Sequence, residues 1–160
     1  MPHIAIVGAG QAGMQLADSL RRGGYTGDVT LIGEEPWLPY QRPPLSKQFL
    51  LGQLDASRVF FRPATHYEKI GVRVRLACRV TAIDRAARRL RLGDGEEISF
   101  DGLALTTGAR VRKLELPGAN DSRICYLRGL SDAEEIRARL VEADRVVIVG
   151  GGFIGLEIAA

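Results

Sequence analysis

The sequence predicts an α/β protein, in which a parallel sheet with an antiparallel β-meander is followed by the start of a second parallel sheet. Three observations lead to this prediction. The chain opens with a β-branched apolar run, a glycine-rich turn and a helical pattern, and a second apolar run follows. Short alternating segments between residues 72 and 107 are typical of strands joined by tight turns. The opening pattern of apolar run, glycine turn and helix start then returns at residues 145–160.

The first part of the chain reads as a βαβ unit. A strand is expected at Ile4–Val7, and helical spacing of apolar residues begins at Gln11. The helix is expected to end at Gly23-Gly24, because glycine is favoured just beyond a helix C-terminus. The second strand is expected at Val29–Ile32. A strand, a tight turn, a helix and a strand in this order form the βαβ unit of a parallel sheet.

The middle of the chain is expected to add helices and then short strands. Short helices are predicted around Leu45–Leu51 and at Pro63–Ile70, and a half-buried strand at Val72–Leu76. The segments RVTAID, RRLRLGDGEEISF and GLALTT predict further strands, with Gly93-Asp94-Gly95 as a hairpin turn. Four arginines of this meander are interpreted as a solvated face: Arg85, Arg88, Arg89 and Arg91.

The last third of the chain is expected to begin a second domain. The loop LPGAND is the best candidate boundary, giving domains of residues 1–115 and 116–160. SDAEEIRARLVEA predicts a helix in which Ser131 is the N-cap and Glu134 completes a capping box. RVVIV then predicts a buried strand. Because a βαβ unit needs its second strand, these residues are expected to be part of a longer chain of roughly 400 residues.

Two glycine fingerprints predict dinucleotide sites. Gly8, Gly10 and Gly13 form GxGxxG between a strand and a helix, which gives a tight turn, backbone access for a pyrophosphate and close helix packing. The free N–H groups near Gln11 and Ala12 are then expected to face the phosphates. This pattern indicates a Rossmann-like domain.

The surrounding sequence strengthens this interpretation. Glu34 stands at the end of the second strand, where a carboxylate can accept both hydrogens of a ribose diol. Gly150, Gly152 and Gly155 repeat the fingerprint after RVVIV. Two dinucleotides are therefore expected, one in each domain.

Composition disfavours several other classes of protein. Apolar residues make up 46% and charged residues 26%, which is ordinary for a globular protein. The net charge of +3 comes with 22 basic residues but no basic stripe interleaved with aromatics, so no nucleic-acid partner is expected. No signal-peptide pattern or membrane-spanning run is found, so a cytoplasmic protein is expected. Cys78 and Cys125 form no CxxC, and neither a disulfide framework nor a metal site is predicted.

Four segments carry a resemblance to a known family: IVGAGQAGMQLADSLRRGGYTGDVTLIGEEPWLPYQRPPLSKQFL, LTTGARVRKL, YLRGLSDAEEIRARL and VVIVGGGFIGLEIAA. They resemble the ferredoxin reductases of oxygenase systems, the putidaredoxin and rhodocoxin reductase type, with apoptosis-inducing factor as a relative. The resemblance covers essentially the whole chain. It implies FAD on the first fingerprint, NADH on the second, and one-electron delivery to a ferredoxin- or rubredoxin-type iron–sulfur protein.

The resemblance also assigns roles to individual residues. It places the FAD pyrophosphate on Gly8, Gly10, Ala12 and Gly13, beside the N–H groups near Gln11, and the adenosine ribose on Glu34. It places Arg42 and Lys47 on the pyrophosphate and isoalloxazine side, and Val80 against the adenine. Thr107 and Gly108 match the end of the family's ATG motif, and Arg128 the arginine of its YLR. NADH is assigned to Gly150, Gly152, Phe153, Ile154 and Gly155.

The chain also departs from the family's pattern. The family's ATGARPR reads TTGARVR here, so that Thr106 adds a hydroxyl at a packed turn and Val111 loosens the next turn. Neither change removes a residue assigned to the cofactor.

The segment RPPLSK distinguishes this chain from related disulfide reductases, which carry redox-active cysteines after the second strand. No cysteine precedes Cys78, which disfavours disulfide reduction. Pro43 and Pro44 fix φ and favour extended residues before them, which predicts a rigid entry to the helix carrying Lys47. From the segment alone, Lys47 could equally be a solvated helix lysine. The resemblance places Glu157 close to it and implies a catalytic Lys47–Glu157 pair.

Two other functions stay open from the sequence. One is an NADH oxidase or the flavin component of a nitrite reductase, which share both domains. The other is a non-enzymatic flavin redox switch like apoptosis-inducing factor. NADH and NADPH are both open as the electron donor.

Overall fold

The computed structural model describes all 160 residues, which fall into two compact units. Unit 1 comprises residues 1–40 and 60–108, and unit 2 comprises residues 41–59 and 109–160. None of the helices combines the length and the apolar character that crossing a membrane requires. The domain boundary expected between residues 115 and 116 stays a prediction.

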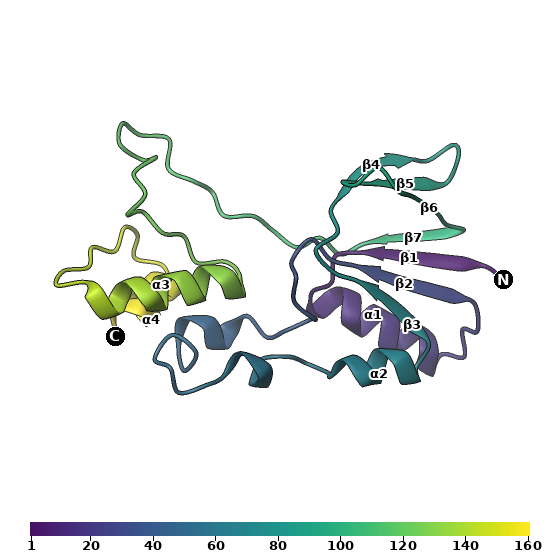
Figure 1. Cartoon of the computed structure of the whole chain (residues 1–160), viewed down its shortest axis with the longest axis horizontal. Coiled ribbons are helices and arrows are strands. Elements are labelled where there is room, and N and C mark those ends of the chain that lie inside the picture. The colour runs from purple at the N-terminus through teal and green to yellow at the C-terminus, as the bar shows by residue number, and fades with distance from the viewer. The chain divides into compact units, whose positions relative to one another are not determined.

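Unit 1 is built on a four-stranded parallel sheet in the order β3-β2-β1-β7 (Figure 1). Its strands are β1 His3–Val7, β2 Asp28–Ile32, β3 Val72–Arg75 and β7 Gly102–Leu105. β1 lies between β2 and β7 and runs parallel to both. These strands confirm the predicted parallel sheet, with bounds that differ from the expected ones by one or two residues.

Two helices cover one face of this sheet, α1 Gln11–Arg22 and α2 Ala64–Lys69 (Figure 1). α1 begins and ends where the sequence predicts, with Gly23 as its C-cap. Because side chains alternate along a strand, every second residue of β1 and β2 faces the helices. The core between helices and sheet consists of Ile6, Met14, Ala17, Val29, Leu31, Tyr67 and Val72.

The other face of the sheet carries the predicted antiparallel meander, β4 Val80–Asp84, β5 Arg89–Leu92 and β6 Glu97–Ser99. The hairpin between β5 and β6 turns at residues 93–96, as expected. Leu90 packs against Ala5 and Ile32 of the parallel sheet, which forms a second core. The arginines of the meander are exposed, and those at 89 and 91 form ion pairs with Glu97, which confirms the solvated face.

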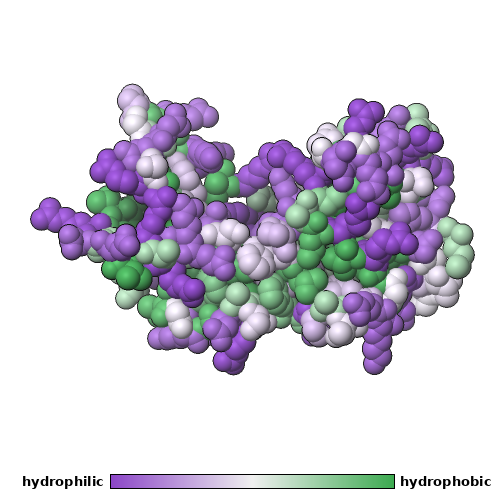
Figure 2. Space-filling view, in the orientation of Figure 1, coloured by the Kyte–Doolittle hydropathy of each residue, from purple (hydrophilic) through white to green (hydrophobic).

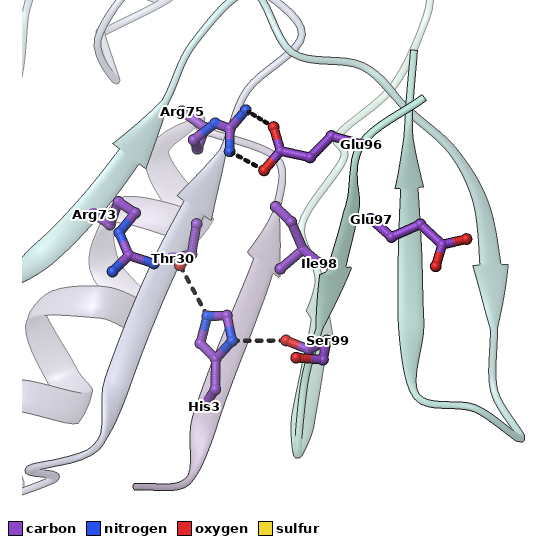
Figure 3. Close-up of a pocket in the computed structure, with 8 residues that line it drawn as sticks. All are labelled: His3, Thr30, Arg73, Arg75, Glu96, Glu97, Ile98 and Ser99. Atoms are coloured by element: carbon purple, nitrogen blue, oxygen red, sulfur yellow. Dashed lines mark hydrogen bonds and ion pairs between the residues drawn. The ribbon is translucent and has the colours of Figure 1, made fainter. Parts of the chain in front are cut away.

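Polar side chains fasten the meander to the parallel sheet around a cavity of about 250 Å³ (Figure 3). The ring of His3 lies within hydrogen-bond distance of the Thr30 hydroxyl, at 2.8 Å, and of the Ser99 carbonyl, at 2.7 Å. Arg75 of β3 donates two bonds to the carboxylate of Glu96, at 2.9 and 2.7 Å. This fork ties the β5–β6 turn to the carboxyl end of β3, where the candidate site begins.

The buried Tyr67 gives a prediction about stability. Its hydroxyl is buried without a hydrogen-bond partner, and burial together with the charge of Asp18 raises its pKa to about 12. Because an unsatisfied buried hydroxyl costs free energy, Tyr67→Phe is expected to raise the free energy of unfolding by about 1 kcal/mol. Urea unfolding at neutral pH measures this change. The control is Tyr25→Phe, which removes a hydroxyl bonded to the Pro2 carbonyl and is expected to destabilise.

The raised pKa of Tyr67 also fixes the sign of a pH effect. The tyrosine of the unfolded chain ionises at about pH 10. Between that pH and about 12, Tyr67 of the folded chain keeps a proton that the unfolded chain has lost. This group therefore lowers stability as the pH rises through that window. The Phe variant lacks this contribution, and an equal alkaline loss of stability in parent and variant would contradict the assignment.

Unit 2 contains the segment RPPLSK, where the sequence prediction was partly wrong. The helix expected around 45–51 is a short 3₁₀ helix, η1 Pro43–Ser46, followed by turns. Pro43 and Pro44 have no N–H, and the N–H of Lys47 bonds to the Pro44 carbonyl in the tighter i→i+3 pattern. Arg42 is helical, with φ −81° and ψ −33°, so the extended conformation expected before proline is also wrong there.

The helix α3 Leu130–Glu142 is present, but its predicted cap was wrong. Gly129 is the N-cap, and the carboxylate of Asp132 accepts the backbone N–H groups of Gly129 and Arg128 at 2.7 and 2.9 Å. Leu130, which is fully buried, therefore lies in the first turn. Ser131 is inside the helix, so it cannot form the expected capping box with Glu134.

The buried strand expected at 145–149 is not formed. These residues pair with no strand of the chain, and Val146, Val147 and Val149 are more than half exposed. A β-strand needs a paired neighbour for its backbone hydrogen bonds, and residues 145–149 belong to neither of the two sheets. Exposed apolar side chains are not confined to this segment, since Figure 2 shows hydrophobic residues among the polar ones over the visible face of the molecule. The helix that follows, α4 Phe153–Ala159, begins where the fingerprint predicts.

Candidate dinucleotide site and lysine–glutamate pair

The fingerprint turn joins β1 to α1 and requires two of its glycines for packing. Gly8 has φ +116°, and a methyl group there would lie 2.2 Å from the Thr106 backbone oxygen. A methyl group at Gly13 would lie 2.1 Å from the Gly8 oxygen. The backbone at the end of β1 therefore contacts both the residues after β7 and the first turn of α1. A residue larger than glycine at position 8 or 13 would prevent these contacts.

Gly10 differs, because nothing lies within 4 Å of the position where its side chain would begin. Its φ of −98° and ψ of −167° lie in the extended region, so conformation does not require glycine. The first hydrogen bond of α1 runs from the Met14 N–H to the Gly10 carbonyl, and Gln11 and Ala12 are exposed. Open space in front of free backbone N–H groups fits a pyrophosphate.

Glu34 lies beside this turn. A methyl group at Gly33 would lie 2.6 Å from the Cβ of Ala9, so the end of β2 is pressed against the fingerprint. The Glu34 side chain is 58% exposed, and its Oε1 lies 3.2 Å from Nη1 of Arg79. Neither Gly33 nor Arg79 was among the predicted site residues. A glycine directly before Glu34 could have indicated the close packing at Gly33. Nothing in the sequence indicates that residues 34 and 79 form a pair.

The residues after β7 complete this edge of the sheet. The Thr106 hydroxyl lies 2.9 Å from the Gly8 carbonyl and 3.2 Å from that of Val7, so the expected departure from the family's alanine is accommodated by hydrogen bonding. Thr107 follows, and Gly108 has φ +69°. Val80 begins β4 and packs on the second core of unit 1. Ligands of open α/β sheets bind at this carboxyl edge.

The Thr106 hydroxyl carries a prediction. Thr106→Val keeps the shape of the side chain but removes the bond to the Gly8 carbonyl, so the free energy of unfolding should fall by about 0.5–1.5 kcal/mol. Urea unfolding of the cofactor-free protein measures this. Thr81→Val is the matched control, because its hydroxyl bonds the Arg91 carbonyl on the exposed meander. Equal losses in both variants would remove the special role of Thr106.

In unit 2, Lys47 and Glu157 form the predicted ion pair, with 2.7 Å between Nζ and Oε1. The hydroxyl of Ser46, a buried residue that was not among the predicted site residues, donates to the same carboxylate. Hydrogen bonds from Lys47 and then Ser46 lower the pKa of Glu157. The Lys47 side chain is half exposed, so water still reaches one side of the pair.

The other assigned residues of unit 2 are held by backbone contacts. Arg42 donates to the Arg128 carbonyl at 2.6 Å, and Nε of Arg128 donates to the Ala109 carbonyl at 2.9 Å. Arg42 and Arg128 are therefore brought together within unit 2.

The second fingerprint repeats the geometry of the first. Gly150 has φ +110°, and a methyl group at Gly155 would lie 2.7 Å from the Gly150 oxygen. Gly152 faces open space, and Phe153 and Ile154 are exposed at the start of α4. The two turns therefore share the same close contact between the first and third glycines.

The family model described as pyridine nucleotide-disulphide oxidoreductase matches residues 2–160. The chain belongs to this family. Rhodocoxin reductase from Rhodococcus erythropolis is 44% identical over 157 residues, which cover 98% of this chain and 37% of the relative. The chain therefore spans well under half the length of this curated relative.

Solved structures of family members agree. The ferredoxin reductase from Rhodopseudomonas palustris superposes with a TM-score of 0.95 at 42% identity, covering 100% of this chain and 39% of that one. Putidaredoxin reductase, in a covalent complex with putidaredoxin, gives a TM-score of 0.91 at 38% identity, covering 99% and 39%. This family member therefore has the Rossmann-type α/β fold of these reductases.

Proposed function

We propose that this chain is the FAD-binding portion, with the beginning of the NADH-binding portion, of a reductase that passes electrons to a ferredoxin- or rubredoxin-type iron–sulfur protein serving an oxygenase. One observation carries the proposal. Gly10 opens onto free space within a turn where Gly8 and Gly13 are fixed by packing, and a carboxylate stands beside it. A cytoplasmic location and a soluble iron–sulfur partner belong to the proposal.

The proposed roles follow the chemistry of each group. The N–H groups at Gly10–Ala12 bind the FAD pyrophosphate, Glu34 binds the adenosine ribose and Val80 contacts the adenine. Arg42, Lys47, Thr107, Gly108 and Arg128 are proposed to serve the rest of the cofactor. The second fingerprint, from Gly150 to Gly155 with Phe153 and Ile154, is proposed to bind NADH.

Bound FAD would accept a hydride and release the two electrons one at a time. Lys47 supplies a positive charge, and its pair with Glu157 and Ser46 holds that charge in place. No cysteine lies in the segment before Lys47, and burial raises the pKa of the first cysteine, Cys78, which disfavours its thiolate. A thiol relay is therefore disfavoured, and an external one-electron carrier fits better. The names of the two solved relatives, a ferredoxin reductase and a reductase complexed with putidaredoxin, support the same partner class.

The test uses the full-length protein without oxygen. NADH is expected to bleach the flavin absorbance, and addition of an oxidised ferredoxin is expected to restore it. Slow bleaching that leaves a persistent charge-transfer band, with no response to ferredoxin, would favour a redox switch. Restoration by oxygen alone would favour an oxidase.

A further inference from the structure

The ion pair between Glu34 and Arg79 is the strongest feature that the proposed function does not use. Two segments meet there, the residues after β2 and the residues after β3. The N–H of Cys78 donates to the Gly33 carbonyl at 2.8 Å, and the N–H of Ala77 donates to the Glu35 carbonyl at 3.0 Å. Two backbone hydrogen bonds therefore join the segments that follow the paired strands β2 and β3, and residues 34 and 79 come within ion-pair distance.

The backbone of Arg79 is fixed on its other side as well. Its carbonyl accepts the N–H of Gly93 in the β5–β6 turn at 2.8 Å, and Val80 after it packs in the second core of unit 1. The same turn is tied to β3 by the Arg75–Glu96 fork (Figure 3). The guanidinium of Arg79 thus extends from a rigid base, while the carboxylate that it contacts stands at the fingerprint turn.

The pairing leaves the carboxylate able to bind. Arg79 contacts Oε1 of Glu34 through one nitrogen, and a carboxylate offers about four lone-pair sites. Oε2 and part of Oε1 stay available for the two hydroxyls of a ribose. A carboxylate held by a planar, always charged guanidinium loses fewer rotamers on binding than a free glutamate does.

We propose that Arg79 is a positioning residue for the adenosine half of the cofactor, which orients the Glu34 carboxylate toward the ribose diol. The inference rests on the proposed FAD site and deepens it. An exposed ion pair by itself contributes little to stability, so the effect is on cofactor affinity and not on folding.

The experiment measures FAD affinity of the deflavinated full-length protein by quenching of flavin fluorescence. Arg79→Gln is expected to weaken binding about fivefold to thirtyfold, equal to about 1–2 kcal/mol at 1.4 kcal/mol per factor of ten. Arg79→Lys, which keeps the charge, is expected to recover part of this loss. Unfolding midpoints of the apoproteins should be unchanged.

Arg89→Gln is the matched control, because Arg89 forms a comparable ion pair with Glu97, 3.1 Å long, at similar exposure on the meander. Its FAD affinity should equal that of the parent. In the Glu34→Gln background, Arg79→Gln should have no further effect, because Arg79 acts through that carboxylate.

Parental affinity in Arg79→Gln, or losses that add in the double variant, would overturn the inference. A parent protein that does not bind FAD would instead overturn the proposed function.

Discussion

Gly10→Val is expected to abolish measurable FAD retention in the full-length protein while the fold persists. The new side chain has free space in the cofactor-free structure, and φ and ψ of Gly10 suit valine. The occupied space is where the proposed pyrophosphate approaches, so we expect affinity to fall at least about a hundredfold, or roughly 3 kcal/mol. Valine is a weaker N-cap than glycine, which costs the apoprotein about 1 kcal/mol or less. The flavin-to-protein absorbance ratio and the apoprotein melting temperature measure the two effects.

Gly8→Ala is the contrasting variant. Its methyl group would overlap the Thr106 oxygen, and φ is +116°, so we expect a loss of folded protein and not of affinity alone. Strain of this kind costs about 1–3 kcal/mol before the steric overlap is counted. If Gly10→Val keeps its flavin, the cofactor does not approach this glycine and the assignment of the turn is wrong.

Lys47→Gln is expected to slow reduction of the flavin by NADH about tenfold or more, and to lower the flavin potential, while FAD stays bound. Reduction places negative charge on the flavin, and the lysine's positive charge favours that state. Each 1.4 kcal/mol lost at the transition state slows the step about tenfold. Stopped-flow absorbance of the full-length protein and a dye-linked redox titration measure the rate and the potential.

Lys69→Gln provides the control, because Lys69 is an exposed lysine at the end of α2. It should leave the rate and the potential at parental values. If Lys47→Gln behaves in the same way, Lys47 is an ordinary solvated lysine, and its bond to Glu157 has no part in flavin reduction.

Local patterns predicted most of unit 1. The strands around the fingerprint, the helix from Gln11 to Arg22 and the meander follow from apolar periodicity, glycine turns and tight hairpins. The sequence alone predicts why Gly8, Gly10 and Gly13 are glycines. In the structure, Gly8 and Gly13 are required by close packing, and Gly10 faces open space. The Lys47–Glu157 pair came from the family resemblance, since its members are 110 positions apart.

The failures have physical causes that a local pattern does not contain. Ser131 and Asp132 both carry side chains that can cap a helix, and in the structure Asp132 is the one that accepts the Gly129 N–H, with Leu130 buried beside it. Residues 145–149 have strand-like sequence, but a strand also needs a neighbour, which the pattern cannot supply. Arg79 meets Glu34 only because β2 and β3 are paired, so its place in the site depends on tertiary structure.

The most direct test of the proposed function is electron stoichiometry in the full-length protein. Under anaerobic conditions with NADH limiting, the account predicts that each NADH reduces two molecules of ferredoxin, because a hydride carries an electron pair and the acceptor takes one electron. When ferredoxin is omitted, NADH consumption should stop after one equivalent per flavin. Continued NADH consumption beyond one equivalent per flavin without an iron–sulfur acceptor, or a ferredoxin that stays oxidised while the flavin is fully reduced, would contradict the proposed function.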